Sequence, residues 1–290
     1  MSNKKWDIGV LDLSRFKSKE IPLSLIYVIK ATCLLESRAD LYSSYLLSVF
    51  QSKKRWRQAI QVWNLEERQH GQALRKWCEL VDPDFSFEKL YSGYISEVLY
   101  HREDGNSVRG SINGELIARC VIEALASGYY AAIRDTVEEP LLREICGRLS
   151  KDEARHYGMF YRFFREVQKT EPVGRWECIK IITKRILELE DDQIIYASYY
   201  VRYSGSQATY DRRIEARRYL NELYPIYRKR HLRYILSLIL PILGFEKHRL
   251  AHRLLTVGVY LVVKVRLMTY RLYALKKVRL KNKLLPPSLP

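Results

Sequence analysis

Two short segments of the chain repeat one pattern, in which a glutamate is followed by two residues and then a histidine. They are Glu67 to His70 and Glu153 to His156. On an α-helix, a step of three residues brings both side chains to one face, about one turn apart. Two such pairs that meet through helix packing offer the mixed carboxylate and imidazole ligands that iron binds well. The sequence therefore predicts a helix around each pair and a metal centre between them.

Apolar residues recur at helical spacing along most of the chain, and no run alternates convincingly in the manner of a β-strand. This pattern predicts an all-α fold. Residues 1–20 are expected to form an irregular arm. Long helices are expected over about 26–50, 54–80, 114–136 and 140–169, and shorter ones near 176–200 and 211–230.

Each expected Glu-x-x-His helix follows a helix that carries an acid on an otherwise apolar stripe. The two acids are Glu36 and Glu123, which precede the motif glutamates by 31 and 30 residues. Such near-equal separations are typical of two helix hairpins of matched length. A carboxylate in apolar surroundings is costly unless it is paired or bound to a cation. The expected metal ligands are therefore Glu36, Glu67, His70, Glu123, Glu153 and His156.

Three further acids near these positions allow alternatives. Asp40 lies one helical turn beyond Glu36 on the same expected face, so either acid is a candidate ligand. We favour Glu36, because its separation matches that of Glu123 and its side chain is longer. Glu66 and Asp152 each precede a motif glutamate and point about 100° away from it. They are interpreted either as surface acids or as groups that orient a histidine of the neighbouring helix.

The positive charge of the chain is concentrated towards its end. The net charge is +17, and residues 228–290 hold 15 Lys and Arg residues against one acid, Glu246. We expect a metal-binding part over 1–175, including the N-terminal arm, and a helical extension over 176–290. Two apolar stretches in the extension, 234–245 and 254–263, are flanked by basic residues. They are too short to cross a bilayer but suit an interfacial membrane anchor, with bends expected at Pro241 and Gly244.

The five cysteines lie far apart, without the spacing of a zinc site or a disulfide framework. We expect buried thiols in a reducing compartment. The charged, interrupted N-terminus does not resemble a signal-peptide core, so a cytoplasmic protein is expected, with peripheral membrane contact as an option. No glycine-rich loop for a dinucleotide or a phosphate is present, so any reducing electrons must come from another protein.

Three segments of the chain resemble the soluble acyl-[acyl-carrier-protein] desaturases. Residues 63–71, Trp-Asn-Leu-Glu-Glu-Arg-Gln-His-Gly, resemble that family's Trp-x-x-Glu-Glu-x-x-His-Gly segment. Residues 152–156, Asp-Glu-Ala-Arg-His, match its Asp-Glu-x-Arg-His segment. The helix around residues 122–124, Ile-Glu-Ala, corresponds to the one that holds its third acid. The resemblance covers about residues 25–170.

This resemblance implies a ferritin-like four-helix bundle with a di-iron centre and additional C-terminal helices. It also implies that Trp63 and Asp152 lie on an electron route to the irons. For the two iron ions it implies that Glu67 and Glu153 are bridging ligands. Glu36 and Glu123 would be terminal ligands, and His70 and His156 would each supply an imidazole ligand.

The implied activity is O2-dependent oxidation of an unactivated C–H bond in an acyl chain linked to a carrier protein or lipid. Two positions differ from the family. Gln69 replaces an arginine before the first histidine, and Ala126 stands where a hydroxyl residue is frequent. The alternative is therefore a di-iron hydroxylase or N-oxygenase of another substrate, such as a membrane lipid, a quinone-like molecule or a tRNA base.

The expected partners follow from the same resemblance and from the charge of the C-terminal region. An acyl carrier protein or a membrane surface would be held by the basic residues, and a ferredoxin-type protein would donate electrons. A homodimer is compatible with the sequence, and a nucleic-acid partner is not expected. Outside enzymes, the alternatives are iron storage and a metal-free scaffold.

Overall fold

The computed structural model describes residues 6–18, 21–97, 107–188, 192–204, 206, 208–245, 250, 252–262, 264–265 and 268. Within these residues every regular element is a helix, which confirms the all-α class. Short 3-10 helices cover Ile8–Val10, Leu13–Arg15, Tyr224–Ile226 and Leu240–Leu243. The α-helices are α1 (Leu23–Glu36), α2 (Ala39–Val49), α3 (Lys54–Val81), α4 (Phe87–Glu97), α5 (Ile112–Arg134), α6 (Pro140–Thr170), α7 (Arg175–Leu187), α8 (Asp192–Tyr203), α9 (Arg212–Leu223) and α10 (Lys229–Ile239).

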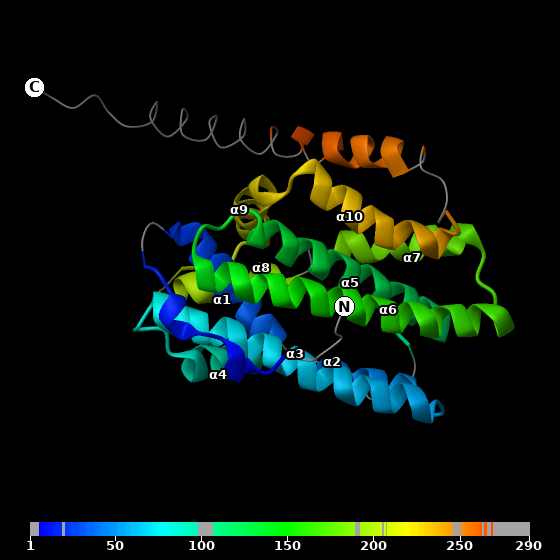
Figure 1. Cartoon of the computed structure of the whole chain (residues 1–290), viewed down its shortest axis with the longest axis horizontal. Coiled ribbons are helices and arrows are strands. Elements are labelled where there is room, and N and C mark those ends of the chain that lie inside the picture. The colour runs from blue at the N-terminus through cyan, green and yellow to red at the C-terminus, as the bar shows by residue number, and fades with distance from the viewer. Residues whose placement is uncertain are drawn as a thin grey trace, which may run out of the picture.

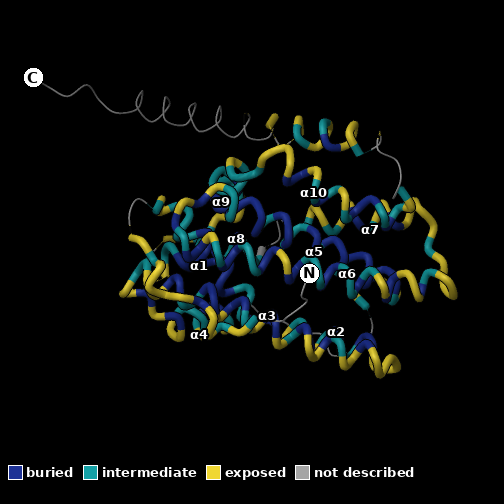
Figure 2. The backbone as a smooth tube through the Cα atoms, in the orientation of Figure 1, coloured by how far each residue is buried: buried dark blue, intermediate teal, exposed yellow. Residues whose placement is uncertain are grey.

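Four helical rods form a ferritin-like bundle, and the first of them consists of α1 and α2 together (Figure 1). α5 packs along α6, while α3 packs against α1, α2 and α6. Figure 2 shows that α5 is largely buried in the middle of the molecule. α7 and α10 cover α5 from the other side, and α8 covers α1. The division of the chain into parts before and after residue 175 stays a prediction.

The helix ends lie where the sequence places stop and start signals. α3 ends at Val81, directly before the Asp-Pro-Asp segment. The side chain of Ser111 caps α5 by accepting a hydrogen bond from the amide of Gly114 at 3.0 Å. Glu139 caps α6 in the same way, and Pro140 occupies its first position. These caps fix the ends of the two central helices.

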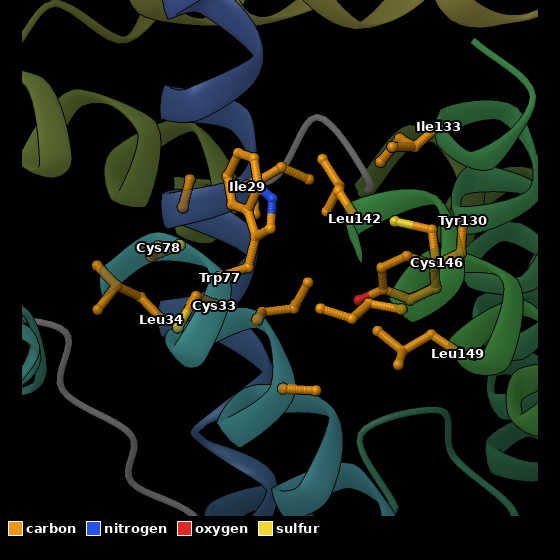
Figure 3. Packing of buried hydrophobic residues seen from close by; sticks show 14 of the residues in the cluster. Ile29, Cys33, Leu34, Trp77, Cys78, Tyr130, Ile133, Leu142, Cys146 and Leu149 are labelled. Carbon is orange, nitrogen blue, oxygen red and sulfur yellow. The ribbon is translucent and has the colours of Figure 1, made fainter. Parts of the chain in front are cut away.

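Two apolar clusters fill the bundle on either side of its middle. The first contains Ile29 of α1, Trp77 of α3 and Leu142 of α6 (Figure 3). The second contains Ile60 of α3 and Phe160 of α6. Each long helix therefore passes from one apolar cluster to the other, and the acidic motifs lie between them along the chain.

The continuous helix expected over 26–50 is wrong, because the chain breaks between α1 and α2. At the break, the hydroxyl of Ser37 donates a hydrogen bond to the carbonyl of Cys33 at 2.7 Å. Ser37 also lies directly against Gly71 of α3, where an added Cβ would be 2.8 Å from the Ser37 hydroxyl oxygen. The apolar periodicity of the sequence continues through this point and gives no sign of a break. The break is instead accompanied by a tertiary contact with α3, which local periodicity does not reveal. As a result, Glu36 is the last residue of α1.

A single helix over 176–200 is wrong for a similar reason. The structure has two helices, α7 and α8, with Glu188 at the end of α7. Here the Glu188 carboxylate forms a two-point ion pair with Arg109, with N–O distances of 2.8 and 2.6 Å. This long-range contact draws the end of α7 towards the start of α5.

The first apolar stretch of the basic region, 234–245, belongs to the folded core. It lies mainly in α10, whose residue Ile235 packs so closely on Gly128 of α5 that an added Cβ there would overlap it at 2.3 Å. Pro241 is the second residue of the 3-10 helix Leu240–Leu243, and Gly244 ends this helix with a left-handed φ of 76°. Several apolar side chains of this stretch, including Ile235, Ile239 and Ile242, are therefore buried in the protein, and membrane contact stays a prediction.

The second apolar stretch, 254–263, is described up to residue 262 and lies in the helix His252–Val262. Several of its apolar side chains are exposed, including Leu254, Leu261 and Val262. By length and composition, α5 is the one described helix that could cross a membrane, but 72% of its apolar window is buried in the bundle. The core position of α5 accounts for its hydropathy.

The close contact at Gly71 gives a stability test. Gly71→Ala should lower the free energy of unfolding by about 1–3 kcal/mol, because the new methyl group overlaps Ser37. The matched control is Gly158→Ala in α6, where the nearest atom to an added Cβ is the Arg162 Nη1 at 3.6 Å. That control should be neutral or stabilising by up to about 1 kcal/mol. Urea unfolding of the metal-free protein measures both, and equal stabilities would contradict the packing described at Ser37.

Candidate metal centre

The six residues expected as ligands come together in the middle of the bundle. Two groups of side chains each offer ligand atoms that lie within 4.8 Å of one another. The first group is Glu36, Glu67, His70 and Glu153, and the second is Glu67, Glu123, Glu153 and His156. Glu67 and Glu153 belong to both groups. This geometry could hold two adjacent cations that share two carboxylates.

The helices place these side chains by their three-residue spacing and by packing across the bundle. Nδ1 of His70 on α3 lies 3.1 Å from a carboxylate oxygen of Glu153 on α6. In the reverse sense, Nδ1 of His156 on α6 lies 2.9 Å from a carboxylate oxygen of Glu67 on α3. Each imidazole therefore faces the motif glutamate of the opposite helix as well as its own.

Orphaned polar atoms show whether this donor set fits a metal. Within the two ligand groups, four buried atoms lack a hydrogen-bond partner among the described residues, namely Oε1 of Glu67, Nδ1 of His70, Oε1 of Glu153 and Nδ1 of His156. Buried polar atoms are nearly always satisfied in folded proteins. Carboxylate oxygen with imidazole nitrogen suits non-haem iron. The residues fit two iron ions, although metal binding itself stays a prediction.

The outer nitrogen of each histidine contacts an acid of the neighbouring helix. Nε2 of His70 lies 3.2 Å from Asp152, and Nε2 of His156 lies 2.8 Å from Glu66. An ionised carboxylate only accepts hydrogen bonds, so each Nε2 donates and each Nδ1 faces the centre. Arg155 binds both acids, at 2.7 Å from Glu66 and 2.5 Å from Asp152. Both acids thus lie where groups that orient a histidine of the neighbouring helix are expected.

Sequence reasoning missed Trp6, which lies in the N-terminal arm. Its indole N–H donates to the same Asp152 oxygen that contacts His70, at 2.6 Å. A lone tryptophan in a polar segment was its one signal, and a contact across 146 residues cannot be read from local spacing. Trp63, which the resemblance implies on the electron route, packs edge-on against His156 with ring centroids 6.4 Å apart.

The break after α1 places Glu36 and Asp40 in different surroundings. Asp40 is exposed, accepts a hydrogen bond from Asn64 at 2.8 Å and lies outside both ligand groups. Glu36 is partly buried, and the hydroxyl of Tyr130 donates a hydrogen bond to its carboxylate. The helix end turns these two acids in different directions.

Burial and like charge together control protonation at the centre. Burial raises the pKa of Glu36 and Glu123 well above the ordinary value, and repulsion by Glu67 and Glu153 adds to the effect. Burial alone would lower the pKa of His70, but the hydrogen bond to Asp152 and the nearby motif glutamates outweigh it and raise that pKa.

The pKa of His156 is likewise raised against burial, by Glu123 first and then by the other acids around it. The surroundings of Glu36, Glu123 and both histidines therefore favour the protonated form of each group.

A cavity of about 750 Å³, which we call the metal-site cavity, opens onto this centre. Four of the expected ligands, Glu36, Glu67, Glu123 and Glu153, line it, and so does Ala126. A separate groove of about 470 Å³ reaches Trp63 and His156. The structure thus provides space for a substrate beside four of the six ligand residues.

Iron binding should release protons, because the cation displaces them from Glu36, Glu123, His70 and His156, whose pKa values are raised. The affinity for Fe²⁺ should therefore rise as the pH increases above 6.5, the ordinary pKa of histidine. Anaerobic calorimetry in buffers of different ionisation enthalpy measures the protons released. Binding of Fe²⁺ with no dependence on the buffer would contradict this protonation pattern.

The comparisons with known proteins agree with the site geometry. A model of the fatty acid desaturase family matches residues 10–192, which is more than half of the chain. Stearoyl-[acyl-carrier-protein] 9-desaturase 2, chloroplastic, of Arabidopsis thaliana is 25% identical over 183 residues, covering 59% of this chain and 44% of its own length. The chloroplastic 9-desaturase 3 of the same plant is 24% identical over 181 residues, with the same two coverages.

The match to these relatives thus extends over less than half of their length. No solved structure matches the chain. The family match includes both Glu-x-x-His helices and the two helices that carry Glu36 and Glu123. The chain therefore belongs to the fatty acid desaturase family.

Proposed function

We propose that this protein is an O2-dependent di-iron oxidase that acts on an acyl chain, in the manner of an acyl-[acyl-carrier-protein] desaturase. The observation that carries the proposal is the pair of overlapping donor groups at the inner end of a cavity. A storage protein or a scaffold has no need of a substrate-sized space that ends at the ligands. The names of the relatives, which are desaturases of carrier-linked stearoyl chains, agree with this choice.

Each ligand residue has a role that follows from its group. Glu67 and Glu153, which belong to both groups, would bridge two iron ions. Glu36 and His70 would complete one position, and Glu123 and His156 the other. When bound, the two irons would use O2 and two electrons to oxidise an unactivated C–H bond, which no protein side chain can do.

The remaining residues of the centre would hold this geometry and protect it. Asp152 and Glu66 fix the two imidazole rings through their Nε2 atoms. The apolar clusters on both sides of the centre exclude water, so reactive species would meet the substrate before solvent. Tyr130 holds the carboxylate of Glu36 at the edge of the cavity.

Electrons would reach the centre through a continuous chain of contacts. Trp6 is half-buried, so an electron donor can approach it from outside, and its hydrogen bond leads through Asp152 to His70. We propose a ferredoxin-type donor for this step. Acidic electron carriers and acyl carrier proteins would both be attracted by the positive net charge of the chain. We propose a cytoplasmic location, because all five cysteines are buried free thiols, as is usual in a reducing compartment.

One observation favours a second candidate within the same chemistry. Ala126 lines the cavity at the position where the family often has a hydroxyl residue. Loss of this hydroxyl removes a hydrogen-bonding group beside Glu123 and changes the environment in which O2 would react. A hydroxylase or N-oxygenase that uses the same ligands is therefore the alternative to a desaturase.

The decisive experiment incubates the iron-loaded protein with ferredoxin, its reductase, O2 and acyl-carrier-protein or lipid pools. Mass spectrometry should detect a loss of two hydrogens for desaturation, or a gain of one oxygen for hydroxylation. Glu67→Ala and Glu153→Ala should each abolish turnover while the helical circular dichroism spectrum persists. Retained turnover in either variant would reject the ligand assignment, and an exposed control, Glu177→Ala, should behave as wild type.

Trp6→Phe tests the electron route separately from the metal site. It removes the N–H donor to Asp152 while leaving the six ligand residues in place. Reduction of the di-iron centre by ferredoxin should slow by about 10- to 100-fold. The iron content should stay at wild-type level, and reduction by a small chemical reductant should be unchanged. Trp176→Phe, at a tryptophan that is 79% exposed, is the control. An unchanged rate with ferredoxin would remove Trp6 from the route.

A further inference from the structure

Three arginines line the metal-site cavity, and we call them the arginine cluster. They are Arg109 before α5, Arg119 within α5 and Arg185 near the end of α7. Their side chains are mostly buried, with exposed fractions of 13%, 11% and 18%. Guanidinium groups are seldom buried unless they meet acids or an anionic ligand. The cavity that ends at the metal centre therefore also contains an unusual concentration of positive charge.

The acids beside the arginine cluster are fewer than the arginines. Glu188 is shared, because it pairs with Arg109 at 2.6 Å and with Arg185 at 3.3 Å. Glu115 is the only described acid within ion-pair distance of Arg119, and the separation is 3.5 Å. Two carboxylates thus face three guanidinium groups. The four other acids of the cavity are the proposed iron ligands, whose charge the metals would neutralise.

Arg119 is the least satisfied member of the cluster. Oε2 of Glu115 accepts hydrogen bonds from the hydroxyls of Tyr45 at 2.7 Å and Ser107 at 2.9 Å, and Oε1 lies 3.5 Å from Nε of Arg119 without a hydrogen bond. The Nε atom of Arg119 is buried and has no hydrogen-bond partner among the described residues. Its guanidinium lies over the ring of Tyr42, 5.7 Å from the centroid. An orphaned donor inside a cavity marks a place where a ligand group would be stabilised.

The state of Arg185 supports this description. Burial lowers its pKa, and the nearby charges of Arg119 and Arg109 lower it further. The three arginines therefore repel one another inside the cavity. An anion placed between Arg119 and Arg185 would relieve it.

We propose that Arg119 and Arg185 bind an anionic group, a carboxylate or a phosphate, that is part of the oxidised substrate. This inference rests on the proposed function, because it takes the metal-site cavity as the substrate site. The rest of the substrate extends past Ile122 and Ala126 towards Glu36 and Glu123. The planar guanidinium suits both anions, since it donates two parallel hydrogen bonds. The substrate is therefore an amphipathic molecule, with its charged end fixed at the cluster and its apolar part at the irons.

Matched small probes test this inference on the unmodified full chain. Octanoate, octyl phosphate and octanol share one apolar chain and differ in the head group. Calorimetric titration should give a dissociation constant for at least one of the two anions that is about 10- to 100-fold lower than for octanol. The preference should weaken as the salt concentration rises. The anion that binds more tightly identifies the source, either a free carboxylate or a phosphate ester. Equal binding of both anions and octanol would overturn the inference.

Variants locate the binding group. Arg119→Gln should remove most of the preference for the anion, and Arg119→Lys, which keeps the charge but loses the planar donor pair, should retain part of it. Arg75→Gln is the matched control, because Arg75 pairs with Glu79 and Glu88 on the outside of α3. Circular dichroism checks that each variant is folded. An anion preference that survives Arg119→Gln and Arg185→Gln alike would place the anion elsewhere and contradict the inference.

Failure of this inference is distinguishable from failure of the proposed function. Loss of the anion preference, with two irons bound and an uncharged acyl chain still oxidised, would remove the arginine cluster from substrate recognition and leave the oxidase. Binding of the anion without any oxidation or iron uptake would keep the anion site and reject the proposed oxidase. The binding measurement is made on both metal-free and iron-loaded protein, so its result does not depend on turnover.

Discussion

The fold depends on placing four carboxylates and two imidazoles in the apolar middle of a helical bundle. Like charges this close repel one another, and their burial adds a desolvation cost. In the metal-free chain, the cost is limited by raised pKa values and by contacts between the histidines and the acids of the opposite helix. Apolar clusters on both sides hold the helices together around this unfavourable region. The bundle is thus built to tolerate a charged centre that a cation would stabilise.

Much of this arrangement could be predicted from the sequence, because it depends on local periodicity. The three-residue spacing in α3 and α6 brings Glu67 beside His70 and Glu153 beside His156, whatever the rest of the chain does. The matched separations likewise put Glu123 on the helix next to these motifs. Such features need only helix geometry and a shared buried face.

The remaining features depend on contacts between distant segments, which no local pattern encodes. The different surroundings of Glu36 and Asp40 depend on the helix break between them. This break lies where Ser37 contacts Gly71 of another helix. Trp6 joins the site through a partner 146 residues away. The excess of arginine in the cavity arises because the fold brings Arg109 before α5, Arg119 within α5 and Arg185 near the end of α7 to one place. In each case, chain topology rather than residue type determines the outcome.

The two proposed iron positions use the same kinds of ligand residue, yet their surroundings differ at the outer nitrogen of each histidine. On one side, the chain from imidazole to acid continues to an aromatic ring at the protein surface. On the other, it leads through Glu66 to the guanidinium of Arg155. The two halves of the site therefore differ in how they connect to the protein surface. An electron that entered through the indole would reach the half that contains His70 before the half that contains His156.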